Sequence, residues 1–263
     1  MKPVIIRYCF SFADGYQEVF DLHIDAQRIE LIGDDPDSLP LWTELDFHKC
    51  PNCLLTKRTH THCPLAVHLV KIVNRFDGLL SYDSVRIDVY TEERVISQDT
   101  TVQRGIGSLM GLIMATSGCP HTAFFKPMAR FHLPLASTEE TVYRATSMYL
   151  LAQYFLKKKR RIADLELQGL KQIYRDIQVV NTSIVERLRR ATGTDSSLNA
   201  IILLDIYSKA LPLAIEESLK AIRYLFAPFF KKKEKGGRQS AKQRGTSQHL
   251  SSSSIFLIEN SRE

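Results

Sequence analysis

The stretch HKCPNCLLTKRTHTHCP, residues 48–64, contains three of the five cysteines and decides how the rest of the chain is interpreted. Cys50 and Cys53 form a C-x-x-C pair, and nine residues separate Cys53 from Cys63. A tight turn lets both sulfurs of such a pair point at one centre, which is the usual first half of a tetrahedral thiolate site. Cys119, further along the chain, supplies a fourth sulfur. We therefore predict that Cys50, Cys53, Cys63 and Cys119 bind one metal ion.

Proline follows three of these four cysteines, as Pro51, Pro64 and Pro120. Proline fixes its own φ angle, favours an extended conformation at the residue before it, and fits the first position of a helix. Three ligands would therefore be held just ahead of rigid turns or helix starts. Cys9 lies in an apolar, strand-like run, and we interpret it as an ordinary buried cysteine.

The sequence indicates the position of the metal site more clearly than the identity of the metal. Four thiolates suit zinc and an iron–sulfur cluster equally well, but the spacing is not that of a ferredoxin. Zinc is placed first because imidazole is a good zinc ligand, so His62 or His121 could replace one sulfur. The histidines of this region are His48, His60, His62, His68, His121 and His132.

Three other interpretations of the cysteines remain open. They could be reduced thiols that pack as small hydrophobic groups. A disulfide framework is disfavoured by the length of the chain and by the lack of a signal-peptide pattern. A thioredoxin-like redox pair would open a helix inside a βαβ unit, and no such unit is visible in the sequence.

Composition favours a folded protein with one large or two small domains. The chain has 263 residues, of which 44% are hydrophobic, and it contains no run of eighteen apolar residues that would predict a membrane span. The net charge is +6, but residues 231–263 carry +5 of it, so the remainder is nearly neutral. Nucleic-acid binding is therefore not expected except through this basic tail. A cytoplasmic location is the default expectation.

Alternating hydrophobic residues predict a small, mostly antiparallel sheet within an α+β fold. Asp14-Gly15 is a hairpin signal between the first two strands. The predicted strands are Val4–Phe12, Tyr16–Ile24, a possible Arg28–Ile32, Val85–Val89 and Arg94–Val102.

Helical spacing predicts one short helix after Pro64 and another over residues 105–116. The second of these contains three glycines, Gly105, Gly107 and Gly111. A glycine-rich helix start can hold a phosphate, but the spacing is not that of a dinucleotide site and no P-loop lysine follows. Close packing of the helix against a neighbour is the favoured interpretation.

The run TTVQRGIGSLMGLIMATSGCPHTAFFKPMARFHLP, residues 100–134, and RATSMYLLAQYF, residues 144–155, resemble an uncharacterised bacterial family classed as a domain of unknown function. The similarity covers mainly residues 45–155. It implies a bacterial, cytoplasmic source, and it brings no activity, cofactor or catalytic residue with it.

The remainder of the chain is predicted to be helical. Ser137 and Glu140 form a capping box that opens a helix, and two further helices are predicted over residues 162–190 and 198–226. The middle helix carries a heptad-like apolar stripe. Its members are Leu170, Ile173, Ile177, Val180, Ile184 and Leu188.

These patterns predict three parts, which are an α+β metal-binding head at 1–136, a helical bundle or arm at 137–230 and a disordered basic tail at 231–263. So much apolar surface on helices within residues 162–226 predicts a homodimer or a protein partner bound there.

The sequence favours a zinc-stabilised scaffold or interaction protein of unknown process. The alternative is a metalloenzyme or an iron–sulfur redox protein that uses the Cys/His cluster. No established catalytic motif is present, so the catalytic residues are unknown and enzymatic activity is undecided.

Overall fold

The computed structural model describes most of the chain up to Phe230. The described residues are 2–33, 38–76, 80–191 and 217–230, together with Asn199, Ile202 and Ile215. The predicted basic tail and most of the helix predicted over residues 198–226 lie outside them. Contacts between residues divide the chain into two units, Met1–Arg223 and Tyr224–Glu263.

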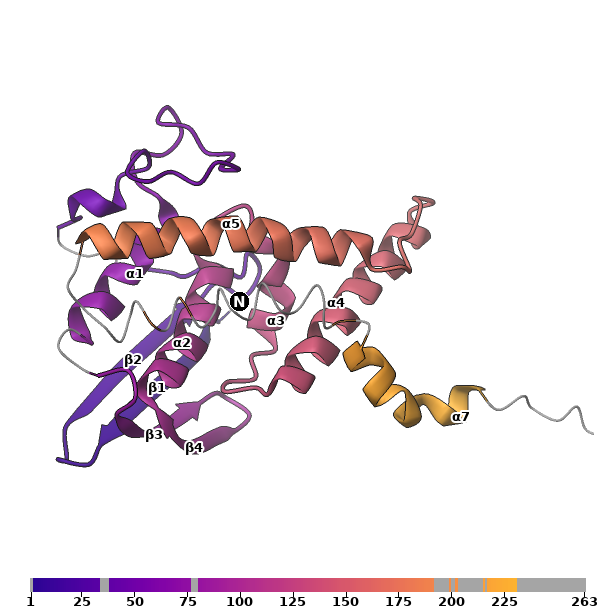
Figure 1. The fold of residues 1–263 in the computed structure, drawn as a ribbon, viewed down its shortest axis with the longest axis horizontal. Coiled ribbons are helices and arrows are strands. Elements are labelled where there is room, and N and C mark those ends of the chain that lie inside the picture. The colour runs from indigo at the N-terminus through magenta and orange to yellow at the C-terminus, as the bar shows by residue number, and fades with distance from the viewer. Residues whose placement is uncertain are drawn as a thin grey trace, which may run out of the picture. The chain divides into compact units, whose positions relative to one another are not determined.

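The sheet of the first unit has four strands in the order β2-β1-β3-β4, and every neighbouring pair is antiparallel (Figure 1). The fold is therefore α+β, as predicted. The strands are β1 (Val4–Phe12), β2 (Gln17–Ile24), β3 (Ser84–Tyr90) and β4 (Val95–Thr101).

One face of this sheet is buried, which explains why alternation located the strands. Tyr8 and Phe10 of β1 are fully buried, whereas Arg7 points to the other face and pairs with Asp21 of β2. Successive side chains of a strand point to opposite faces, so the polar alternates reach solvent while the apolar ones meet the core.

Helices α1 (Pro64–Arg75) and α2 (Val102–Thr116) cover the buried face. Pro64 stands at the first position of α1, as predicted from its fixed φ angle. Gly105 explains how closely α2 approaches the sheet, because a Cβ there would lie 2.0 Å from Ile87 Cδ1 and 2.8 Å from Phe10 Cε1. Gly105 therefore serves close packing, whereas a Cβ on Gly111 would meet nothing within 4 Å.

The C-terminal half of the unit contains α3 (Lys126–Arg130), α4 (Thr138–Lys158) and α5 (Gln168–Ala191). The capping box predicted at Ser137 is present. The Ser137 side chain accepts a hydrogen bond from the Glu140 amide, and the Glu140 carboxylate accepts one from the Ser137 amide. A 3-10 turn (Arg223–Phe226) begins at the last residue of the first unit, and the second unit contains α7 (Ala227–Phe230).

Helix α5 contributes to two hydrophobic clusters. Its C-terminal half shares the core of the sheet, and its N-terminal half packs with α4. The apolar stripe predicted on this helix is thus covered by the chain itself. The residues in the sheet core are Val180, Ile184, Val185 and Leu188, and those packed with α4 include Leu170, Ile173 and Tyr174.

Two predicted elements differ from the structure. Residues 28–32 form only an isolated bridge, between Ile24 and Leu31, instead of a strand. Helix α5 begins at Gln168 rather than Ile162 because Asp164 competes for the backbone, its carboxylate accepting hydrogen bonds from the Gly169 amide and the Tyr149 hydroxyl. The three-part division at residues 136 and 230 concerns independent folding and stays a prediction.

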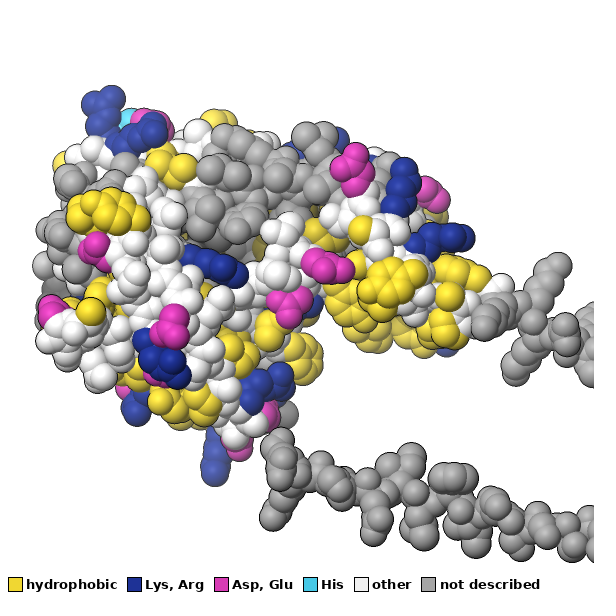
Figure 2. All heavy atoms as spheres, turned by 60° about the horizontal axis from the view of Figure 1, so that its bottom comes forward, with side chains coloured by type: hydrophobic (Ala, Val, Ile, Leu, Met, Phe, Trp, Pro, Cys, Tyr) yellow, Lys and Arg dark blue, Asp and Glu magenta, His cyan; other side chains and the backbone are white. Residues whose placement is uncertain are grey.

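Basic side chains do not form one continuous patch on the face of the molecule shown in Figure 2. There the described Lys and Arg side chains lie scattered among acidic and apolar ones. This distribution agrees with the near-neutral charge of the chain outside its basic tail.

Gly105→Ala is expected to destabilise the protein by about 1–3 kcal/mol because its Cβ overlaps two fully buried side chains. The matched control is Gly111→Ala on the same helix, which has open space and gains up to about 1 kcal/mol from helix propensity. Urea unfolding measures both, and equal effects would contradict the packing described for α2.

Candidate metal centre

The four predicted ligands come from three places in the fold. Cys50 and Cys53 lie on a turn in which the Cys53 amide donates to the Cys50 carbonyl over 2.9 Å. Cys63 is the residue just before α1, and Cys119 follows the glycine that ends α2. The two helix ends and the turn are thus the elements that position the sulfurs.

The loop that carries the C-x-x-C pair is closed at its base by backbone hydrogen bonds. Leu45 N–H donates to the Thr61 carbonyl over 2.9 Å, and Cys63 N–H donates to the Thr43 carbonyl over 2.8 Å. These bonds hold Cys63 next to the start of the loop, so the pair projects from a fixed base.

All four thiols lie against the core of the sheet. Cys63 is buried, and Cys50, Cys53 and Cys119 are partly buried beside it. Burial raises the pKa of Cys50 to about 11, and negative charge on Cys63, Cys53 and Cys119 acts in the same direction. The charges of the other three cysteines therefore reach Cys50, which places all four in the same region of the core.

Hydrogen-bond donors around the thiols oppose the effect of burial. Burial raises the pKa of Cys119, while the backbone N–H groups of His121 and Thr122 lower it. At Cys50 the Ser183 hydroxyl of α5 lowers the pKa in the same way. Donors of this kind favour the thiolate, which is the form that binds metals.

The side chains are not arranged as a formed metal site. Within the described ranges, no three or more His, Cys, Asp or Glu side chains make a group that could hold a metal ion. All five cysteines are free thiols. The assignment of four ligands to one metal therefore stays a prediction.

The histidines do not surround this cluster as a set. His121 lies beside it, and its Nε2 is 2.6 Å from the Asn52 carbonyl on the turn between the paired cysteines. His62 bonds instead to Thr43 Oγ1, and His48 and His60 are exposed. His121 thus positions the turn, which is a role distinct from replacing a sulfur.

Helix α5 covers the cluster, and its most important contact is made by Arg187. This side chain is 1% exposed, and its guanidinium donates to the carbonyls of Trp42, Glu44 and Leu45 at 2.7, 2.7 and 2.9 Å. Its positive charge lowers the pKa of Cys63, although burial raises that pKa overall. Arg187 therefore fastens α5 to the base of the cysteine loop and places a cation near the thiols.

Sequence reasoning missed Arg187, although a signal for it existed. The apolar stripe of α5 advances from Leu170 to Ile184 by alternating steps of three and four residues, and a further step of three reaches residue 187, beside Leu188. An arginine at a buried heptad position predicts an internal partner for its charge, because a buried cation without acceptors is strongly unfavourable.

Comparison with known proteins gives the family of the chain and no activity. The family described as Domain of unknown function (DUF6901) matches residues 6–227, so the chain belongs to this family. The resemblance to an uncharacterised family is confirmed, and a bacterial source stays a prediction. No curated protein and no solved structure matches the chain. Among the described helices, none combines the length and the apolar character that crossing a bilayer requires.

Arg187→Met is expected to lower the free energy of unfolding by about 3 kcal/mol or more, because three carbonyls of the 42–45 turn lose their donor. Arg189→Met is the matched control. Arg189 lies two residues away, is exposed and pairs with Glu186 at the surface, so its loss should change stability by less than about 1 kcal/mol. Denaturant unfolding of both variants measures the two free energies. An Arg187→Met chain as stable as the parent would refute the proposed role of Arg187 in holding α5 to the loop.

A pH effect is expected in protein stripped of metal. The pKa of Cys50 lies at about 11 in the folded chain, against a reference value of 9.0. The neutral thiol therefore favours folding below pH 9, and this stability is lost as the pH rises toward 11. Between pH 8 and 11 the chain should lose about 2 kcal/mol more than Cys50→Ser, which has no thiol to titrate. Identical pH profiles would contradict the burial of this thiol.

Proposed function

We propose that Cys50, Cys53, Cys63 and Cys119 form a zinc centre and that the protein is a zinc-stabilised scaffold or interaction protein. What supports the proposal is that four cysteines from three separate segments pack in or against the same core, and that the charges of the other three act on Cys50. Reduced cysteines that merely fill a core have no reason to gather from a loop and two helix ends. Thiolates that bind one metal ion must come together in this way.

The proposed centre would join parts of the fold that few other contacts hold. The C-x-x-C turn lies in a long connection between β2 and α1, where regular structure is limited to a short 3-10 turn (Leu41–Thr43) in the described part. Binding zinc would fasten this turn to the start of α1 and the end of α2. The free energy of metal binding then becomes free energy of folding.

The charge around the cluster suits a group of thiolates. Zinc with four thiolates carries a net charge of −2, which is costly to bury unless cations or donors compensate it. Arg187 supplies a buried cation, and Ser183 and the amides after Cys119 supply donors. Partial compensation of this kind is what a buried thiolate site needs.

A structural role is favoured over a catalytic one by the composition of the ligand set. Structural zinc sites are closed by four protein ligands, whereas catalytic sites keep an open position for water. Four cysteines leave no open position. A metalloenzyme or an iron–sulfur protein remains the alternative function.

Association with a second copy or a protein partner through residues 162–226 also remains a proposal. The stripe on α5 is buried within the chain, so a partner would meet other side chains. Leu165 is exposed in the link before α5, and exposed apolar residues lie on the neighbouring helix α4. The latter include Tyr143, Leu151, Tyr154 and Phe155.

Elemental analysis of the purified full chain tests the proposed centre. We expect about one zinc per chain, and no metal in Cys53→Ser. Cys9→Ser is the matched control, because Cys9 is partly exposed on β1 and should leave both the metal content and the melting temperature unchanged. The Cys53→Ser chain should melt well below the parent chain.

The same preparation separates the alternatives. Broad visible absorbance near roughly 400 nm together with bound iron would identify a cluster. Protein that remains free of metal after reconstitution with zinc under reducing conditions, and that melts as Cys53→Ser does, would overturn the proposal.

A further inference from the structure

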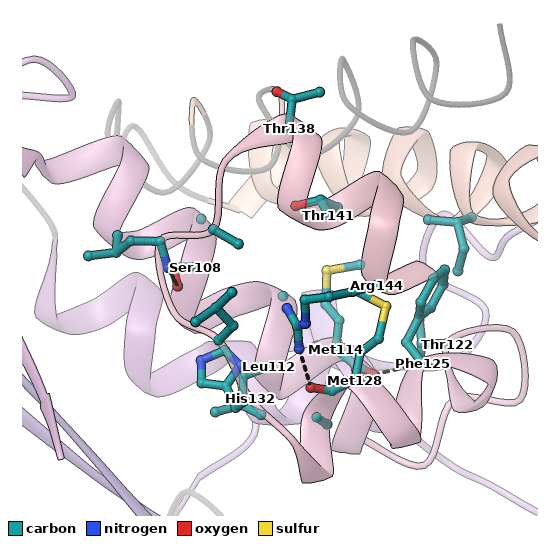
Figure 3. A pocket seen from close by; sticks show the side chains of 18 of the residues that line it. Ser108, Leu112, Met114, Thr122, Phe125, Met128, His132, Thr138, Thr141 and Arg144 are labelled. Atoms are coloured by element: carbon teal, nitrogen blue, oxygen red, sulfur yellow. Dashed lines mark hydrogen bonds between the residues drawn. The ribbon is translucent and has the colours of Figure 1, made fainter. Parts of the chain in front are cut away.

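A cavity of about 260 Å³ lies among helices α2, α3, α4 and α5 (Figure 3). No cysteine lines it, so it is separate from the proposed zinc centre. Its floor is the face of α2 that carries Ser108, Gly111 and Leu112, and its far wall is α4, which presents Thr141 and Arg144.

Most of the wall is apolar. Leu112 and Met114 come from α2, Met128 from α3, and Ile177 from α5, with Phe125 closing one side. An engineered apolar cavity of about 150 Å³ holds benzene, which has six non-hydrogen atoms. In the same proportion, this cavity has room for about ten non-hydrogen atoms.

Two arginines supply the positive charge at this cavity. Arg144 is half-buried and donates through Nη2 to the carbonyls of Met128 and Phe131, at 2.9 and 2.8 Å. Arg104 stands at the rim and donates to the Leu135 carbonyl over 3.4 Å. Each guanidinium carries five N–H donors, so both keep donors for a further acceptor.

No carboxylate side chain lines the cavity among the described residues. The acidic group that acts on Arg144 is Glu140, and its Oε2 is already engaged by the Ser137 amide in the capping box of α4. Neither arginine forms an ion pair with a described carboxylate. A partly buried cation of this kind favours an anion from outside the chain, because desolvating it alone is costly.

The Tyr8, Ser108 and His132 side chains form an uncharged hydrogen-bonded group beside the cavity. Tyr8 Oη lies 2.9 Å from Ser108 Oγ and 2.5 Å from His132 Nε2. Burial and the charge of Arg144 lower the pKa of His132 to about 3, so the ring is neutral at physiological pH. The Ser108 hydroxyl also accepts the Leu135 amide over 3.0 Å. Charge recognition therefore depends on the two arginines.

We propose that this cavity binds a small amphipathic carboxylate, such as a medium-chain fatty acid, with its carboxylate at Arg144 and Arg104 and its alkyl chain along α2. A chain of eight carbons with its carboxylate has ten non-hydrogen atoms, which matches the estimated capacity. Bidentate pairing with guanidinium suits a planar carboxylate. Apolar walls with a few convergent polar groups are the usual form of a small-molecule site.

Gly111 makes room for this ligand. It faces the cavity from the middle of α2, and a Cβ built on it meets nothing within 4 Å. A larger side chain at this position would extend from this open space into the alkyl site, so Gly111→Leu should block the cavity, and leucine is a good helix former.

Titration calorimetry of the full chain with sodium octanoate tests the proposal. We expect one site with a Kd on the order of 0.1 mM, since ligands of this size gain about 0.5 kcal/mol per atom. Octan-1-ol and octylamine, which share the chain and lack the anion, should bind at least tenfold more weakly. Equal binding of octanol would overturn the role of the arginines.

Three variants locate the site. Gly111→Leu should abolish binding without lowering the melting temperature, and Arg144→Gln should weaken binding at least tenfold. Arg130→Gln is the matched control, because Arg130 lies on α3 over the Phe131 ring and does not line the cavity. Absence of binding to the parent chain, or full binding by folded Gly111→Leu, would refute the proposal.

Discussion

The burial of Arg187 against three backbone carbonyls is the interaction on which the rest of the structure depends. A guanidinium is costly to remove from water unless acceptors replace its hydration. Trp42, Glu44 and Leu45 supply those acceptors from the segment at the base of the cysteine loop. Because the acceptors are directional, they fix the position of α5 along its own axis, which hydrophobic packing alone would leave less defined.

Helix α5 therefore acts as a common wall for two different sites. Its C-terminal half covers the cysteines through Ser183 and Arg187, while Tyr174 and Ile177 nearer its start line the cavity. A displacement of this helix would alter both places at once. The fold thus provides a physical link between the region of the four cysteines and a cavity with the composition of a binding site.

The sequence predicted those parts of the fold that depend on local pattern. The strands were located by alternation because only one face of the sheet is buried, and the start of α4 was located by its capping box. The strand predicted over residues 28–32 was wrong. Leu31 forms only a single bridge with Ile24, a contact that leaves little pattern in the local sequence. The predicted start of α5 was wrong because the Asp164 carboxylate accepts a hydrogen bond from the Gly169 amide, which overrides an apolar pattern that extends further back.

Of the two candidate sites, only the one with a local sequence pattern could be predicted. The cysteines are visible in sequence because their chemistry is unusual and their spacing is local, and the structure brings them into one neighbourhood. The cavity is invisible because its residues are ordinary ones from four helices. From the sequence alone, Arg144 would be interpreted as a surface cation. Its hydrogen bond to the Met128 carbonyl is visible only in the structure.

The contact between Arg187 and the 42–45 segment also has a consequence for biosynthesis. About 140 residues separate the two partners, and chains grow at roughly 5–20 residues per second. The early segment therefore leaves the ribosome on the order of ten seconds before its cation is made. During that interval Cys50, Cys53 and Cys63 are already synthesised without the helix that later covers them, so the nascent chain exposes reduced thiols to its surroundings before its fold can close.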